Sequence, residues 1–192
     1  MFELYNTSEQ KKLTYSDYTA KDDGFRYELI NGELLMSPAP SFFHQMSNSD
    51  LALFLKLYIK EHSLGWVVEA PTDVILDNYN TVQPDIIFIS KENFSKIKKN
   101  AMYGAPDLVV EIISPNSIRR DRYIKKELYE KHGVKEFWLV DIENKSVEVF
   151  NNNDRHFELF SLTVETGKIE SNLFPELEIL IESILPDFDY LS

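Results

Sequence analysis

Two apolar segments of the sequence contain a carboxylate where an all-apolar strand would be less costly. Asp85 stands at the start of the apolar run Ile86–Ile89, and Glu111 lies inside the apolar run Leu108–Ile113. An ionised carboxylate buried in such a strand needs a cation or hydrogen-bond donors nearby. Two carboxylates, with water completing an octahedral shell, suit Mg²⁺. Asp85 and Glu111 are therefore candidate ligands of a metal ion.

A cationic side chain follows the second segment at a spacing that could serve this pair. Asp121, Lys125 and Tyr129 recur every four residues and share one face of a predicted helix over 117–132. An ammonium group on that face could orient an attacking water and neutralise charge that develops on a phosphate. Carboxylates and lysine together indicate hydrolysis of a phosphodiester.

Each of these residues also has an interpretation without chemistry. Glu111 could face solvent or pair with an arginine, and Asp107, which follows a proline, is typical of a turn. Asp121 and Lys125 could form an ordinary surface ion pair four residues apart, with Tyr129 as an anchor. The residues alone do not choose between the two interpretations.

The elements that would position these residues can be read from periodicity and turn signals. Asn31-Gly32 is a strong hairpin signal, and Gly24 and Gly133 are typical helix stops. Apolar residues at helical or strand-like spacing predict the remaining elements. The predicted helices are 13–23, 44–62 and 117–132, and the predicted strands are 27–30, 33–36, 65–69, 73–76, 86–89, 108–113, 136–140 and 147–150.

This order of elements predicts an α/β fold, or more strictly an α+β fold, with a mixed sheet flanked by helices and an N-terminal β-hairpin. No repeat or linker divides the chain, so one domain is expected over residues 1–192. The segment 151–192 is read as a C-terminal extension without an assigned function. Gly133, Trp138 and Asp141 are explained by a helix end, a core aromatic residue and a turn.

Composition narrows the classes of function. The chain has no cysteine, which excludes disulfides, thiolate metal sites and cysteine nucleophiles. Residues 1–12 lack the apolar core of a signal peptide and no long apolar run is present, so a cytoplasmic protein is expected. The net charge of −12 opposes nucleic-acid binding over the whole surface. Residues 91–135, however, hold 11 basic and 6 acidic residues and are compatible with one phosphate-facing surface or with solvated helix faces.

Three motifs give the sequence a specific resemblance. They read P-D-L-V-V-E-I-I-S-P from Pro106, D-R-Y-I-K-K-E-L-Y from Asp121 and G-V-K-E-F-W-L-V-D from Gly133. Earlier segments, Y-E-L-I-N-G-E-L from Tyr27 and Q-P-D from Gln83, follow in the same order. Over about residues 13–150 the chain resembles the Uma-two (Uma2) family of restriction endonucleases. The resemblance implies a restriction-endonuclease-like core of the PD-(D/E)XK nuclease superfamily.

The resemblance also implies roles for particular residues. Asp85 and Glu111 correspond to the metal-binding carboxylates. The superfamily's usual lysine position, two residues after the glutamate, is Ile113 here, so Lys125 is expected to supply the amine from the helix, with Lys126 as the fallback. The same motifs place Glu33 and His44 as further cleft residues, although a histidine there could equally be a cap or a surface residue. Glu28 is read as structural.

Together, the carboxylates, the lysine and the resemblance imply a Mg²⁺-dependent endonuclease that acts on DNA, with Mn²⁺ as a substitute ion. An alternative is a nuclease-fold module that binds nucleic acid or protein without effective turnover, which the acidic body favours. A second alternative is a homodimer whose function is protein interaction, with its interface in the C-terminal third. No membrane partner is expected.

Overall fold

A computed structural model describes residues 11–115 and 117–186 of the chain. Most of residues 1–12, the segment that lacks the apolar core of a signal peptide, and the last residues of the C-terminal extension lie outside these ranges. Among the described residues, no helix combines the length and apolarity that crossing a bilayer requires. The expectation of a single domain over residues 1–192 stays a prediction.

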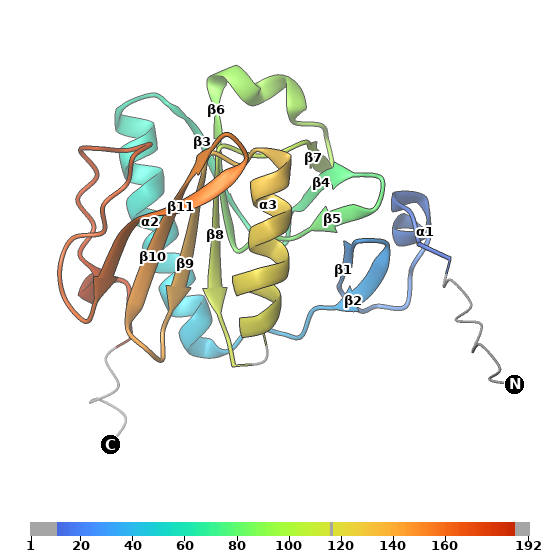
Figure 1. Ribbon diagram of the computed structural model, residues 1–192, viewed down its shortest axis with the longest axis horizontal. Helices are drawn as coiled ribbons and strands as arrows, with labels where there is room; N and C mark the ends of the chain where they lie inside the picture. The colour runs from blue at the N-terminus through green and yellow to red at the C-terminus, as the bar shows by residue number, and fades with distance from the viewer. Residues whose placement is uncertain (1–10, 116, 187–192) are drawn as a thin grey trace, which may run out of the picture.

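The predicted α/β class is confirmed, but the strands form two mixed sheets rather than one (Figure 1). The larger sheet has the order β11-β10-β9-β8-β6-β3 and the smaller has the order β2-β1-β5-β4-β7. Only the pairs β8–β9 and β4–β7 are parallel within the two sheets. The strands of the larger sheet are β3 (Gly65–Glu69), β6 (Ile86–Ser90), β8 (Leu108–Ile113), β9 (Glu136–Asp141), β10 (Ser146–Asn153) and β11 (His156–Val164). Those of the smaller sheet are β1 (Tyr27–Ile30), β2 (Glu33–Met36), β4 (Asp73–Asp77), β5 (Asn80–Val82) and β7 (Ala101–Tyr103).

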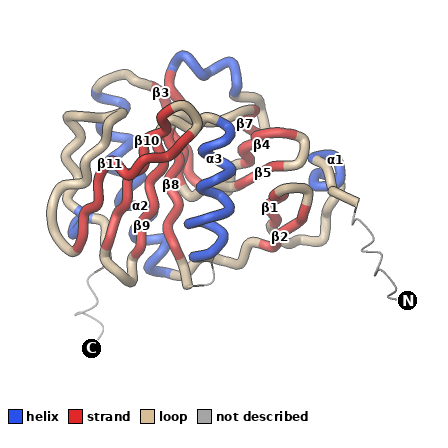
Figure 2. Tube along the Cα trace, in the orientation of Figure 1, coloured by secondary structure: helices blue, strands red, loops and turns tan. Residues whose placement is uncertain are grey.

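Helices cover both faces of the larger sheet (Figures 1 and 2). The long helix α2 (Phe42–Glu61) lies on one face, and α3 (Lys126–His132) lies on the other, preceded by the π-helical segment η2 (Arg120–Lys125). The β8–η2–α3–β9 connection is the crossover that makes β8 and β9 parallel. The short elements are α1 (Tyr15–Thr19), η1 (Lys91–Lys96) and η3 (Ile181–Ser183).

The hydrophobic core has two layers because the central strands are buried on both faces. On β8, Leu108 and Val110 pack in the layer that contains α2. Val109 and Ile113 pack in the layer that contains α3 and strands of the smaller sheet. Successive side chains of a strand point to opposite faces, so Glu111 can share the α3 side with Val109. The side chain predicted to carry chemistry therefore points toward the helix that carries Lys125.

The local predictions hold best where turn chemistry sets the ends. Asn31 and Gly32 have φ angles of 54° and 83°, as a two-residue hairpin turn of type I′ requires, and β1 and β2 have the predicted bounds. Gly133 adopts a left-handed conformation at the end of α3. The helix predicted over 13–23 is wrong in length, because α1 spans Tyr15–Thr19 and buries none of its residues, so no packing extends it.

The C-terminal extension completes the core instead of standing apart from it. Ile169, Phe174 and Ile179 pack against the α2 layer. The buried carboxylate of Glu136, the first residue of β9, accepts hydrogen bonds from Ser171 Oγ (2.6 Å) and from the backbone N–H of Asn172 (2.9 Å). The sequence predicts a packed tail with short strand-like pieces from Phe157, but it gave no sign of the anchoring of Glu136, of the short strands β5 and β7, or of the full length of β11.

Asp107 proves to be a structural anchor rather than a plain turn residue. Its side chain is buried and accepts hydrogen bonds from the Ser90 N–H (2.8 Å) and Asn93 Nδ2 (2.9 Å), and it pairs with Lys135 Nζ (2.7 Å). Burial opposes ionisation, but Lys135, Asn93 and Ser90 outweigh it and lower the pKa of Asp107. This carboxylate ties together the end of β6, the start of β8 and the residue before β9.

We expect Asp107→Ala to lower the free energy of unfolding by about 2–4 kcal/mol at pH 7, because several buried partners lose their acceptor. Urea unfolding measures this cost. Since the folded pKa of Asp107 is lowered, its ionised form stabilises the protein above the ordinary aspartate range and loses that effect as pH falls through the folded pKa. The difference between wild type and Asp107→Asn should therefore shrink in acid, and a difference that grows in acid would contradict the assignment.

Candidate active site

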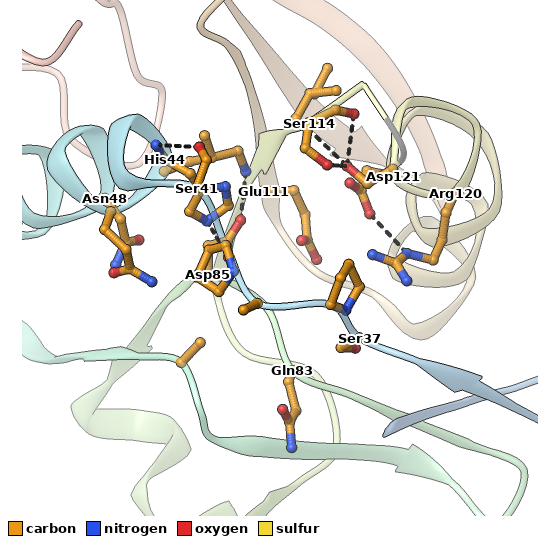
Figure 3. Close-up of a pocket in the computed structure, with 18 of the residues that line it drawn as sticks. Ser37, Ser41, His44, Asn48, Gln83, Asp85, Glu111, Ser114, Arg120 and Asp121 are labelled. Carbon is orange, nitrogen blue, oxygen red and sulfur yellow. Dashed lines mark hydrogen bonds and ion pairs between the residues drawn. The ribbon is translucent and has the colours of Figure 1, made fainter. Parts of the chain in front are cut away.

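A cavity of about 630 Å³ opens at the end of the larger sheet where β8 finishes and β6 begins (Figure 3). Its wall contains the first turns of α2, the proline-containing segment 37–41, the segment 83–85, the end of β8 and η2. Ser41 caps α2 by accepting a hydrogen bond from the His44 N–H (3.1 Å). Ser41, Phe43 and His44 line the cavity, so the first turn of α2 faces it and places the positive end of the helix dipole there.

Asp85 is held from two sides at the start of β6. Its Oδ2 accepts a hydrogen bond from the backbone N–H of Ile112 on the adjacent strand β8 (2.7 Å). Its Oδ1 lies 3.0 Å from Nε2 of His44 on α2. The carboxylate is thereby fixed beside β8 while its side chain remains partly exposed to the cavity.

Glu111 lies in β8 and is almost completely buried. Its Oε1 accepts hydrogen bonds from Lys125 Nζ (2.8 Å) and from Tyr129 Oη (2.5 Å). Burial raises the pKa of Glu111 well above its ordinary value, and Asp121, Asp85 and Glu28 add to this rise, while Lys125 opposes it. Glu111 therefore sits in a field of excess negative charge that a further cation would relieve.

Lys125 is the central cation of the site, with only 2% of its surface exposed. Its Nζ lies 2.8 Å from both Glu111 Oε1 and Glu28 Oε1, and 3.8 Å from Asp121 Oδ1. Burial alone would lower the pKa of Lys125, but Glu111, Glu28 and Asp121 outweigh it and raise that pKa above the usual lysine value. The amine is therefore a permanent positive charge and is unsuited to accept a proton as a general base.

Glu28 comes from the smaller sheet and brings the hairpin into the site. Its Oε1 accepts the Gln83 N–H (2.8 Å), and Arg120 Nη1 lies 3.8 Å from its buried Oε2, which has no hydrogen-bond partner. Asp121 Oδ1 is likewise buried without a hydrogen bond, 3.5 Å from Arg120 Nε. Figure 3 shows Glu111 between Asp85 on one side and Asp121 with Arg120 on the other. Two orphaned carboxylate oxygens thus border the same cluster.

The structure gathers most of the predicted site residues but not all of them. Asp85, Glu111, Lys125 and His44 line the cavity, and the surface interpretation of Asp121 and Lys125 is wrong because both are buried. Glu33 is exposed and does not line this cavity, because it stands beside the hairpin turn at the far end of β2. The hairpin carboxylate at the cavity is instead Glu28, read from sequence as structural. Its position in the otherwise apolar strand Y-E-L-I was a signal of the same kind as that of Glu111.

Lys126, the fallback for Lys125, has a different environment. Its Nζ lies 3.6 Å from the ring centroid of Phe150, a cation–π contact on β10, and it does not line the cavity.

The basic stretch of residues 91–135 does not form one phosphate-facing surface. The lysines of η1 follow the end of β6, about 17 Å along the strand from Asp85. Lys125 is buried and Lys135 pairs with Asp107. Arg120 lines the cavity together with the buried Lys125 and is the more exposed of the two.

The residues present fit a divalent metal ion by their chemistry. The available donors are carboxylate oxygens, which hard cations prefer, and the cluster of Glu28, Asp85, Glu111 and Asp121 exceeds the charge of Lys125 and Arg120. Within the described part of the chain no set of three or more histidine or acidic side chains is already arranged as a metal cage. Two protein carboxylates with water as the remaining ligands is the arrangement typical of Mg²⁺.

Comparison with known proteins identifies a family and a similar fold. The model of the Uma2 family, described as "Putative restriction endonuclease", matches residues 13–182. The fold resembles the crystal structure of a putative nuclease belonging to DUF820 from Anabaena variabilis, with a TM-score of 0.74 and 19% sequence identity. The similarity covers 94% of this chain and 99% of that one. No curated protein matches the sequence.

Proposed function

We propose, from the premise that the chain belongs to the Uma2 family, that it hydrolyses phosphodiester bonds of DNA with the help of a divalent metal ion, Mg²⁺ or Mn²⁺. One observation carries the proposal: Glu111 and Lys125 form a buried ion pair on the cavity wall, and the Ile112 N–H holds Asp85 beside the strand that carries Glu111. An ion pair of this kind costs desolvation energy that an apolar pair would avoid. Its place at a cavity favours a chemical role.

Asp85 and Glu111 would hold the metal ion. When bound, such an ion supplies a water of lowered pKa and neutralises charge on the phosphate. The protein's own groups prepare the site for it. The Ile112 N–H and His44 orient Asp85, while Lys125 and Tyr129 occupy Oε1 of Glu111 and leave its Oε2 for a ligand.

Lys125 and Arg120 have separate tasks in this proposal. Lys125 is locked between Glu28 and Glu111, so it positions Glu111 and contributes fixed positive potential without exchanging a proton. Arg120 has more exposure than Lys125 and lines the cavity, so its guanidinium is the better candidate to contact a phosphate oxygen. The first turn of α2 supports an anion at the same place.

The test is cleavage of single-stranded, double-stranded and supercoiled DNA with Mg²⁺ or Mn²⁺. Cleavage that requires the metal and disappears with a chelator supports the proposal. A protein that produces no products with any metal, while binding DNA with salt-sensitive affinity, would be a binding module instead. The net charge of −12 is the observation that favours this alternative.

His44 gives a further prediction about the same site. We expect His44→Ala to lower the cleavage rate by about 10- to 100-fold, because Asp85 loses a partner that orients one of its oxygens. His44→Gln can retain a hydrogen bond and should lose less. Rates measured over a range of Mg²⁺ concentrations would show a higher metal requirement for His44→Ala. Cleavage by His44→Ala at the wild-type rate would remove the histidine from the site.

A further inference from the structure

Helix α2 carries an apolar stripe on its outer side, opposite to the side that packs on the sheet. Leu51, Leu55 and Ile59 are buried in the core. Phe42, Met46, Leu53 and Leu57 of the same helix are exposed. At 3.6 residues per turn these four side chains fall within about 60° of the helix circumference, so they lie along one side of the helix, with the exposed Ser49 and Asp50 between Met46 and Leu53. We call Phe42, Met46, Leu53 and Leu57 the α2 stripe.

The α2 stripe is symmetric about its own midpoint. Met46 and Leu53 lie equally far from the point between Ser49 and Asp50, and so do Phe42 and Leu57. Two such helices packed antiparallel about a two-fold axis at that point would set Met46 against Leu53 and Phe42 against Leu57 of the second copy. The small side chain of Ser49 would lie next to the axis and allow close approach. A surface that complements itself is what a two-fold interface requires.

We propose that the α2 stripe is the contact between two copies of this chain, with the α2 helices antiparallel. The residues it uses are independent of the cleavage chemistry. Because the first turn of α2 lines the cavity, the pairing would place two cavities in one assembly. Phe42 of one copy would lie about 22 Å along the helix axis from Phe42 of the other. Two sites at that separation could act on both strands of one duplex.

A competing apolar surface lies on the edge strand β11, where Leu159, Leu162 and Val164 are exposed. That strand is less suited to a second copy. Ser161 Oγ and Thr163 Oγ1 donate hydrogen bonds to the backbone of residues 170 and 168, so a neighbouring segment already lies along it. Exposed Glu158 and Glu165 stand at its two ends and would meet like charges in a symmetric pair.

The expected dimer is weak. A helix of 20 residues is about 30 Å long and offers less area than the roughly 800 Å² per partner of a standard interface. Asp50 flanks the axis and would face its own copy, which opposes association at low salt. We therefore expect a dissociation constant on the order of 10 μM.

Sedimentation equilibrium of wild type, Leu53→Glu and Leu162→Glu tests the proposal. The two leucines are matched, with exposed fractions of 53% and 55%, and they lie on the two competing surfaces. Wild type and Leu162→Glu should dimerise equally, and Leu53→Glu should raise the dissociation constant at least about tenfold. A wild type that stays monomeric, a Leu53→Glu that dimerises normally, or a dimer lost in Leu162→Glu would overturn the proposal. The readout is mass, so its failure says nothing against DNA cleavage.

A second measurement does not depend on how well Leu53→Glu folds. The chain has no cysteine, so Ser49→Cys introduces a single thiol next to the proposed axis. Mild oxidation should join two copies through a disulfide, because residues beside the axis come within the Cα separation that a disulfide needs. Ser95→Cys, on the exposed surface of η1, is the control and should remain uncoupled. Equal coupling of both variants, or none of Ser49→Cys, would contradict the antiparallel register.

Discussion

Glu111→Gln is expected to lower the rate of DNA cleavage by about a thousandfold or more while the protein stays folded. Glutamine keeps the shape of the side chain and an oxygen that can accept from Lys125 and Tyr129, so the local packing survives. The carboxylate charge that would hold the metal ion is lost. Because the pKa of Glu111 is raised by burial and by neighbouring carboxylates, removing this charge should not destabilise the metal-free protein.

The measurement pairs cleavage of supercoiled DNA with thermal unfolding in the presence and absence of Mn²⁺. Glu33→Gln is the matched control, because it makes the same substitution on an exposed glutamate outside the cavity and should cleave like wild type. A bound ion should raise the midpoint of wild-type unfolding and that of Glu33→Gln, but not that of Glu111→Gln. Equal cleavage by all three proteins would mean that the products come from a contaminant or from another site.

Lys125→Met should produce the largest loss of stability among these variants, about 3–5 kcal/mol in the free energy of unfolding. Methionine fills similar space, but Glu28, Glu111 and Asp121 would then be left in a buried cluster without their central cation. Cleavage should also fall, since Glu111 loses the group that positions it. The matched control is Lys126→Met, which removes the adjacent lysine from its contact with Phe150 and should cost much less.

We attribute the loss of stability in Lys125→Met to the missing positive charge rather than to the changed side-chain shape. A second substitution distinguishes these two causes. Lys125→Met combined with Glu28→Gln removes one negative charge together with the positive one, so it should recover part of the stability. Urea unfolding of wild type, Lys125→Met, Glu28→Gln and the double variant gives the coupling energy between the two side chains. No recovery in the double variant would point to lost packing.

The pH dependence of wild-type stability follows from the same cluster. Because the pKa of Lys125 is raised in the folded protein, its stabilising charge is complete below the ordinary lysine value of 10.5 and is lost only as pH rises through the folded pKa.

The fold was largely predictable where a local signal had one structural outcome. Asn31-Gly32 admits a tight turn of one hand, which set both strands of the hairpin. Apart from Glu111, the run Leu108–Ile113 is apolar on both faces, as a central strand of the sheet requires. The short strands β5 and β7 gave no such signal, because three residues cannot show a period and the pairing partners of a strand determine whether it forms.

The candidate site divides in the same way. Sequence alone indicated Asp85 and Glu111 as polar residues in apolar strands, and it indicated that Asp121, Lys125 and Tyr129 share a helix face. The sequence could not show whether the Asp121–Lys125 pair is buried or on the surface. The spacing of the residues shows that they share one side of the helix, but not which other elements cover that side. The sequence also favoured Glu33 over Glu28, since two glutamates of one hairpin differ only in which end of the strands approaches the larger sheet.

By itself, then, the sequence determined the family, the α/β class and the residue types of the proposed metal-dependent phosphodiesterase site, because these depend on local pattern and chemistry. Only the tertiary structure decided that the hairpin belongs to a second sheet and that Glu28 joins Glu111 around Lys125. The physical reason is burial: away from water, the charge of Lys125 is stable only beside Glu28 and Glu111, and their charges are stable only beside Lys125. That dependence arises only when strands and helices distant in sequence enclose them together.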